Sequence, residues 1–234
     1  MNKYRIAELN VLMNPLHETL KSRAHSYLFD FDGKEDIAAA LSAEEIQEKQ
    51  NAHPNLTLDD CEYLYTGADF YEKLLGFDGM FLHASAVAVG GNAYLFSAPC
   101  GGGKSTHTAL WQEYFGKDRA IIINDDKPAI RLINDTLYVF GTPFSGKSDK
   151  NTNIKVPLKA ICFLEHAKEN SIRKMSAVEA LMQIFNQTLR PTDAKRMEKL
   201  IFLVDKLLKH IPVYKMGCNM SLDAVETSYT QMSK

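Results

Sequence analysis

The sequence is poor in the features that mark secreted, membrane and nucleic-acid-binding proteins. It has four cysteines, none at the short spacing of a zinc site, a redox pair or a haem attachment. Its longest uninterrupted apolar runs are about five residues, against the roughly 20 that a transmembrane helix needs. Lysines and arginines number 27 against 29 aspartates and glutamates, a formal net charge of −2. We therefore expect no membrane span, and no nucleic-acid binding that depends on bulk positive charge.

The cysteines and the N-terminal residues favour a cytoplasmic location. Widely spaced thiols are typical of reduced cytosolic proteins, and Cys162 lies in the apolar run 160–164, where we expect a buried small hydrophobe. Residues 1–6 are followed by no long apolar stretch, so they do not resemble a signal peptide.

The length and composition predict one main domain with an attached lobe. The chain has 234 residues, of which 45% are hydrophobic and 24% charged, close to the globular average. Near residue 80 the sequence changes to short runs of small, apolar, strand-favouring residues. This change predicts a small N-terminal α+β lobe over residues 1–79 and a main domain over residues 80–234. In the lobe, we expect strands over 4–13 and 26–31, a helix over 43–51, and a helix that Thr57 caps and that runs to about Leu75.

The main domain alternates short apolar strands with helices. Strands are predicted over residues 81–89, 93–97, 120–123, 158–164 and 209–216, with a hairpin formed by 129–133 and 136–140. Helices are predicted over 104–115, 177–189 and 194–208, and a last one from about Ser221. This mixture indicates an α/β fold with a mixed sheet, since a purely doubly wound fold would lack the hairpins.

The most specific motif is Ser97-Ala-Pro-Cys-Gly-Gly-Gly-Lys-Ser-Thr106, which follows a predicted strand and opens a predicted helix. Three glycines let the backbone curl closely around phosphate, and the following helix adds free N–H groups and a positive dipole. Lys104 would place its charge near the β- and γ-phosphates, and Ser105 would place its hydroxyl in a Mg²⁺ shell. The predicted phosphate-binding residues are Ala98, Pro99, Cys100, Gly101, Gly102, Gly103, Lys104, Ser105 and Thr106.

Two positions depart from the common form of such loops. The position six residues before the lysine, commonly glycine, is Ala98, and Cys100 stands where many loops carry serine. The alternative interpretation is an ordinary glycine-rich turn before a helix, which leaves Gly-Lys-Ser at the helix start unexplained. Cys100 itself is open to two interpretations, a spacer or a thiol made reactive by the positive field of the loop.

Two further segments place chemical groups at the ends of predicted strands. His83 lies 21 residues before Lys104, and Asp125 and Asp126 follow an apolar strand, where open α/β sheets hold their ligands. Adjacent carboxylates repel each other, which is tolerable when one coordinates Mg²⁺ and the other acts as a base. One aspartate, or one histidine, would be unspecific, whereas the pair together with an upstream histidine is more specific.

These segments resemble the HPr kinase/phosphoenolpyruvate carboxykinase superfamily, and in particular small bacterial HPr-kinase-like proteins often called serine kinases. Those proteins typically carry Leu-His-Ala-Ser-Ala, Gly-Lys-Ser-Thr-His and Ile-Asn-Asp-Asp-Lys-Pro, which stand here at 82–86, 103–107 and 123–128. The similarity continues through 141–147, 156–160 and 189–191. It implies a phosphoenolpyruvate carboxykinase-like P-loop domain for the residues after the lobe.

The resemblance also implies roles for four residues of these motifs. Lys104 would bind the β- and γ-phosphates of ATP or another nucleoside triphosphate, and Ser105 and Asp126 would bind Mg²⁺. Asp125 would be the general base that takes the proton of the acceptor hydroxyl. The residues alone leave open which carboxylate is the base and which holds the metal.

His83 and Arg190 complete the set of catalytic residues that the resemblance implies. His83 would contact the transferred phosphoryl group or the metal, and Arg190 would stabilise the developing charge. For Arg190 the alternative is the C-terminal cap of a helix. The polar, cationic segment 141–155 is either a flap over an anionic ligand or a solvated loop.

The function predicted from these residues is Mg-ATP-dependent transfer of a phosphoryl group to a hydroxyl acceptor, either a small molecule such as serine or a Ser/Thr in a peptide. The downstream signature of HPr kinase proper is absent, so HPr itself is not the expected substrate. A nucleotide-dependent switch or assembly ATPase without a phosphoacceptor is the alternative, and a nucleotide-binding relative without turnover is the third. The acceptor, the preferred nucleotide and the oligomeric state, a homo-oligomer included, stay open.

Overall fold

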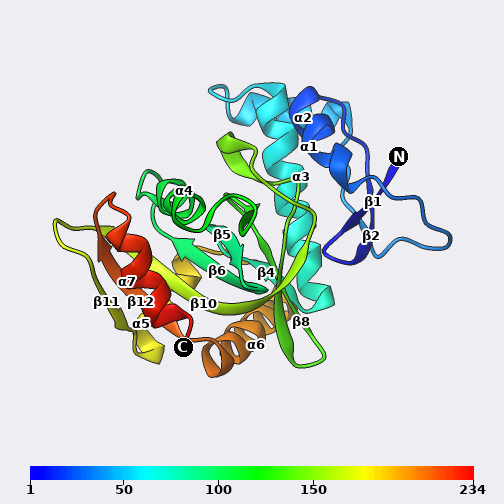
Figure 1. Ribbon diagram of the computed structural model, residues 1–234. Coiled ribbons are helices and arrows are strands. Elements are labelled where there is room, and N and C mark those ends of the chain that lie inside the picture. The colour runs from blue at the N-terminus through cyan, green and yellow to red at the C-terminus, as the bar shows by residue number, and fades with distance from the viewer.

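The computed structural model describes residues 1–234, which form a small sheet near the N-terminus and a larger mixed sheet (Figure 1). In the N-terminal part, α1 and α2 pack on α3, and α3 contacts the small sheet through β3. The elements of this part are β1 (Asn2–Ile6), β2 (Leu9–Met13), α1 (Glu18–Ala24), η1 (His25–Tyr27), β3 (Ile37–Ala38), α2 (Ala43–Ala52), α3 (Leu58–Leu74) and η2 (Leu75–Phe77).

In the N-terminal part, one predicted strand is divided in two and the other is absent. The stretch 4–13 is a hairpin of β1 and β2, because Ala7 and Glu8 take φ angles of 52° and 62° and reverse the chain. Neither residue is a typical turn former, so the turn carries no local sequence signal. The stretch 26–31 is a 3-10 turn followed by irregular chain, and its apolar residues do not alternate between two faces: Leu28 and Phe29 are both exposed.

The predicted starts of α2 and α3 are confirmed by their caps. The Thr57 hydroxyl accepts a hydrogen bond from the Asp60 N–H at 3.0 Å, and the Asp60 carboxylate accepts one from the Thr57 N–H. Ser42 and Glu45 form the same reciprocal pair at the start of α2. Each pair satisfies backbone N–H groups that a helix leaves free at its first turn.

The main sheet is mixed and curled, because the long strand β10 belongs to both of its wings. The first residues of β10 pair antiparallel with β9, whereas from Leu158 onward the strand runs parallel to β6 and then also to β12. One wing has the order β4-β8-β9-β10, and the other has β7-β5-β6-β10-β12-β11. The elements are β4 (Gly79–Phe81), β5 (Ala84–Val89), β6 (Asn92–Ser97), α4 (Lys104–Phe115), β7 (Ala120–Asn124), β8 (Ala129–Ile133), β9 (Thr136–Phe140), η3 (Gly146–Ser148), β10 (Lys155–His166), β11 (Ser171–Lys174), α5 (Ala177–Asn186), α6 (Ala194–His210), β12 (Val213–Cys218) and α7 (Asp223–Met232).

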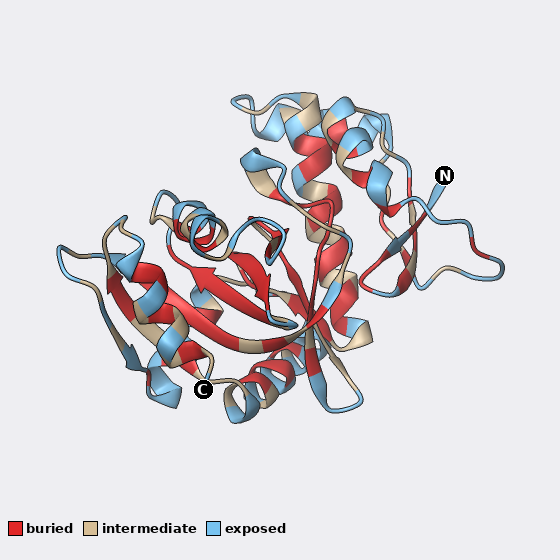
Figure 2. Ribbon diagram, in the orientation of Figure 1, coloured by how far each residue is buried: buried red, intermediate tan, exposed pale blue.

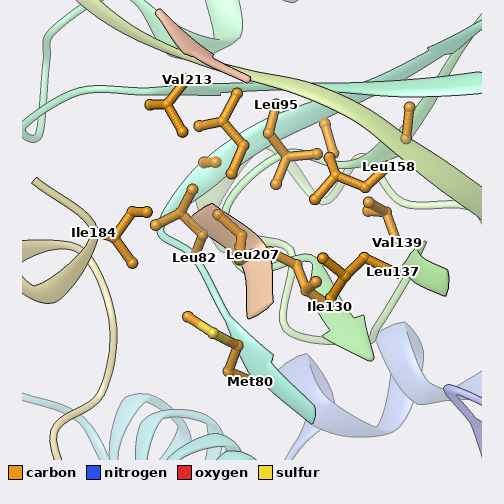
Figure 3. Packing of buried hydrophobic residues seen from close by; sticks show 14 of the residues in the cluster. Met80, Leu82, Leu95, Ile130, Leu137, Val139, Leu158, Ile184, Leu207 and Val213 are labelled. Carbon is orange, nitrogen blue, oxygen red and sulfur yellow. The ribbon is translucent and has the colours of Figure 1, made fainter. Parts of the chain in front are cut away.

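Helices cover both faces of this sheet, so its central strands are almost wholly buried (Figure 2). Alternate residues of a strand point to opposite faces. On β6, Leu95 belongs to one apolar cluster with Ile184 of α5 and Leu207 of α6, all labelled in Figure 3, while Phe96 packs with Trp111 of α4 on the other face. The predicted α/β class with a mixed sheet is therefore confirmed.

Besides the apolar clusters on the two faces of the main sheet, another apolar cluster joins the N-terminal part to this sheet. It contains Phe70 and Tyr71 of α3 together with Ala129, Phe140 and Phe144, which follow residue 80 in the chain. The division of the chain at residue 79 stays a prediction. None of the helices has the length and apolar character that crossing a bilayer requires.

In the main domain, most predicted elements are present with shifted ends. The predicted strand 81–89 is interrupted at Leu82 and His83, because the His83 N–H donates to the Gln187 carbonyl at 2.7 Å instead of joining the sheet. The predicted helix 177–189 ends at Asn186, and β11 was not predicted. All four cysteines are free thiols, and Cys162 is fully buried as predicted.

Candidate functional site

The register of three strands brings the predicted site segments to one edge of the main sheet. At this edge Ser97, the last residue of β6, pairs with Ala84, the first residue of β5, and Asn124 at the end of β7 pairs with Ala86. The glycine-rich loop 98–103, His83 and the two aspartates therefore leave the sheet side by side. The Ser97 hydroxyl donates to the His83 carbonyl at 2.8 Å.

The loop between β6 and α4 takes a conformation that depends on its glycines. Gly101 and Gly103 have φ angles of 77° and 88°, which other residues rarely adopt. At Gly102 the limit is space, because a Cβ there would lie 2.6 Å from the Ala98 methyl and 3.0 Å from the Pro99 carbonyl oxygen. The Gly102 N–H donates to that same carbonyl at 2.9 Å and closes the turn.

This turn leaves a row of backbone N–H groups without acceptors. The hydrogen bonds of the chain use the N–H of Gly102 and, from the first turn of α4, that of His107. Those of Gly101, Gly103, Lys104, Ser105 and Thr106 have no acceptor. Successive free N–H groups at a helix start form a concave site of positive potential that suits an anion.

Lys104 adds a cation to this site. Its ammonium donates to the Ala98 carbonyl at 3.1 Å, across the loop, and the residue is 8% exposed. Burial lowers the pKa of Lys104, and the carboxylates of Asp126 and Asp125 oppose that effect. Ser105 follows Lys104 on the exposed side of the helix start.

Asp126 is held as a carboxylate by two basic side chains. His83 Nε2 lies 3.1 Å from Asp126 Oδ1, and the Lys127 ammonium binds Oδ2. Burial alone would raise the pKa of Asp126, but the hydrogen bond from His83 and the charge of Lys127 outweigh it and bring the pKa to about 2. The other ring nitrogen of His83 lies 2.9 Å from the Gln187 side-chain oxygen, which fixes the orientation of the ring.

Asp125 lies deeper and accepts hydrogen bonds from hydroxyls. Ser85 of β5 donates to its Oδ1 at 2.5 Å, and Ser148 donates to its Oδ2 at 2.6 Å. Ser85 also lies 2.7 Å from the hydroxyl of Thr108, one turn along α4 from Lys104. The two adjacent carboxylates thus have different surroundings: hydroxyl groups contact Asp125, whereas basic side chains contact Asp126.

The segment 141–155 packs directly over the carboxylates. The Asp125 N–H donates to the Lys150 carbonyl at 3.0 Å, and a Cβ at Gly146 would lie 2.6 Å from the Asp126 Cβ. The N-terminal part holds this segment from the other side, where Tyr27 donates to the Asn151 side chain at 2.7 Å and Arg23 lies 3.3 Å from Asp149.

The structure does not bring Arg190 into contact with the other predicted site residues. Arg190 is exposed and forms no hydrogen bond or ion pair, whereas Gln187, three residues earlier, holds His83. Sequence reasoning missed Gln187 and Ser148 because both come from distant segments. It could have found Ser85, which lies two residues after His83, at the spacing that keeps side chains on one side of a strand.

The side chains present limit how a metal ion could be held. No group of three or more His, Cys, Asp or Glu side chains converges in the chain. The side-chain oxygens predicted to hold a metal or act beside it are those of Ser105, Asp125 and Asp126. Such a sparse set is typical of Mg²⁺, which keeps several waters and is held by one or two carboxylates together with substrate phosphates.

Fold and site define an α/β protein in which a glycine-rich loop with acceptor-free N–H groups and two carboxylates meet at one edge of a mixed sheet. The family model described as SynChlorMet cassette protein ScmC matches residues 64–224, so the chain belongs to this family. No curated protein matches the sequence.

Among solved structures, the HPr(Ser) kinase/phosphatase from Coxiella burnetii aligns with the chain. The alignment covers 66% of this chain and 99% of that one, at 12% identity and a TM-score of 0.34. A likeness of this size carries no conclusion about activity.

Proposed function

We propose that the chain is a phosphoenolpyruvate carboxykinase-like P-loop kinase, which transfers the γ-phosphoryl group of ATP to a hydroxyl acceptor in the presence of Mg²⁺. The observation that carries the proposal is the meeting of five acceptor-free N–H groups, the Lys104 ammonium and two carboxylates at one sheet edge. Phosphoryl transfer depends on this combination, because it needs positioning and charge stabilisation more than covalent chemistry.

In this proposal, the loop residues 98–106 bind the phosphate chain. The N–H groups from Gly101 to Thr106 donate to phosphate oxygens, and Lys104 exchanges the Ala98 carbonyl for the β- and γ-phosphates. Because burial lowers the pKa of Lys104, an anionic phosphate beside it would stabilise its charged form. The loop therefore fits a nucleoside triphosphate better than a neutral ligand.

The two aspartates divide the remaining work. Asp125 takes the proton from the acceptor hydroxyl as the hydroxyl oxygen bonds to the γ-phosphorus, and ADP leaves with the electron pair of the broken P–O bond. The Ser148 hydroxyl already donates to Asp125 at 2.6 Å, the geometry that a general base needs toward an alcohol. Asp126, whose pKa of about 2 keeps it ionised, would hold the metal together with Ser105. His83 orients the Asp126 carboxylate.

When bound, Mg²⁺ would supply charge neutralisation to the β- and γ-phosphates. His83 and Lys127 each contact one oxygen of Asp126, so a metal ion held by Asp126 would compete with these two side chains. Arg190 is exposed and follows Gln187 by three residues in the chain. We propose that its side chain reaches the site only when an acceptor is present.

A label-tracing assay tests this function. The protein is incubated with Mg²⁺ and γ-labelled ATP, and with hydroxyl metabolites that include serine, with a peptide pool, or with no acceptor. We expect label on one class of acceptor, no transfer by Lys104→Met, and unchanged transfer by Lys117→Met, which changes an exposed lysine beyond the C-terminal end of α4. Label released only as free phosphate, at one rate with every acceptor, would instead indicate a switch or assembly ATPase.

A further inference from the structure

A small apolar cavity lies next to the candidate site, between α3 and the main sheet. Its volume is about 130 Å³, and seven of its nine lining residues are hydrophobic. Four of the nine, Tyr63, Tyr71, Phe81 and Phe144, are aromatic. Leu64, 41% exposed, stands at its rim, so the cavity opens to solvent on the α3 side.

The wall of this cavity is fixed by the protein. The Tyr71 hydroxyl binds the Lys127 carbonyl and lies 2.9 Å from the Thr142 hydroxyl. The Tyr63 hydroxyl accepts from the Gly146 N–H at 2.9 Å. Because both hydroxyls are engaged, the rings offer a carbon surface to an occupant. Protein interiors are close-packed, so an open apolar space of this kind calls for a ligand group.

One residue connects this cavity to the carboxylates. Lys127 lines the cavity, and its ammonium pairs with Asp126. The chain gives a second connection. Phe144, which lines the cavity, lies two residues before Gly146, and the Gly146 backbone packs against the Asp126 side chain. Lys127 thus borders both the cavity and Asp126, so a hydroxyl bound at the carboxylates would lie beside the cavity.

We propose that this cavity binds a compact apolar group of the phosphoacceptor, so that the preferred acceptor carries an aliphatic chain or a single ring beside its hydroxyl. This inference rests on the proposed kinase function and adds the class of acceptor to it. Cavities of about 150 Å³ with apolar walls bind benzene, which sets the size of the group at that of a leucine or phenyl side chain. Free serine has no such group and would leave the cavity empty.

The chemistry of the cavity fits two sources of acceptor, a seryl peptide and a free amino alcohol. The test therefore uses matched pairs: N-acetyl-Ser-Leu-amide against N-acetyl-Ser-Gly-amide, and leucinol against ethanolamine. For each compound two quantities are measured, kcat/KM for label transfer from ATP and affinity in the presence of a non-hydrolysable ATP analogue. We expect the apolar member of at least one pair to exceed its partner about 10- to 100-fold in both quantities.

Variants of α3 assign that preference to the cavity. Ala68→Leu fills the space and Leu64→Asp places a charge at the exposed rim, and both should reduce the preference to about two-fold or less. Ala52→Leu, an exposed position at the end of α2, is the matched control and should keep it. Melting temperatures show that the variants are folded.

The two readouts separate this proposal from the kinase function. An apolar preference in binding that the α3 variants remove, without phosphoryl transfer to any acceptor, would support the cavity and contradict the kinase. Equal transfer to polar and apolar members of both pairs would overturn the acceptor proposal and leave the kinase in place. The absence of any preference in binding, or a preference that Ala68→Leu and Leu64→Asp retain, would also overturn it.

Discussion

Gly102 is the residue whose replacement the loop should tolerate least. A methyl group there would meet the Ala98 methyl at 2.6 Å and the Pro99 carbonyl oxygen at 3.0 Å, so the turn that orients the free N–H groups must open. We expect Gly102→Ala to weaken nucleotide binding about 5- to 150-fold, because overpacking of this kind typically amounts to about 1–3 kcal/mol. Calorimetric titration with the ATP analogue measures the affinity.

Two further variants identify the contact responsible. Gly76→Ala is the control, since a Cβ at Gly76 has no neighbour within 4 Å, and its nucleotide affinity should match the wild type. Ala98→Gly in the Gly102→Ala background removes the closer of the two contacts and should restore part of the binding. Wild-type affinity in Gly102→Ala alone would contradict this account of the loop.

The same residues show why part of the site could be predicted and part could not. The free N–H groups follow from local glycine and helix-start chemistry, so the loop and Lys104 are visible in the sequence. The partners of the carboxylates are not: Ser148 and Gln187 reach Asp125 and His83 from segments that the fold, and no local pattern, brings near.

Among the elements, α5 begins at a capped first turn and ends next to Gln187, which contacts His83 of the site. At its start, Glu179 binds Arg173 and the N–H of Ser176, and these hydrogen bonds lower its pKa to about 2. A lowered carboxyl pKa gives stability that is fully present above the ordinary value near 4.5 and is lost as the pH falls through about 2. We expect the first turn of α5 to fray over that pH range.

Cα chemical shifts of the first-turn residues of α5 measure this fraying. In Glu179→Gln the shifts should indicate a less ordered turn at pH 6 and should change little between pH 4.5 and 2. Glu198→Gln, at an exposed position of α6, should behave as the wild type. Identical pH dependence in the wild type and Glu179→Gln would show that Glu179 does not hold the cap.

Elements with local signals were predicted well, and elements without them were missed. The starts of α3, α4 and α6 were predicted because cap residues or the Gly-Lys-Ser motif mark them. The β1–β2 hairpin was missed because its turn uses Ala7 and Glu8 at positive φ. The break at His83 was missed because its cause is the distant carbonyl of Gln187.

At the scale of the molecule, the N-terminal part braces the segment that covers the carboxylates. Tyr27 is fully buried and donates to Asn151 at 2.7 Å, across a chain separation of 124 residues. Tyr27→Phe removes this bond and leaves the Asn151 oxygen without its donor, so we expect a loss of about 1–2 kcal/mol in the free energy of unfolding. Urea unfolding measures it, and amide exchange of residues 145–152 should become faster.

Tyr65→Phe is the matched control, because Tyr65 lies on α3 and its hydroxyl forms no hydrogen bond. It should change neither the unfolding free energy nor the exchange of residues 145–152 by more than experimental error. Faster exchange in both variants, or in neither, would contradict a bracing role for the N-terminal part.

The central claim, that Asp125 is the base of a phosphoryl transfer, is tested most directly by Asp125→Asn. Single-turnover label transfer and affinity for the ATP analogue are measured for this variant and for Asp118→Asn, an exposed control. We predict that Asp125→Asn loses about 10²- to 10⁴-fold in transfer rate and keeps nucleotide affinity within about two-fold, because Asp125 acts on the acceptor proton. Transfer at the wild-type rate in Asp125→Asn would contradict the account.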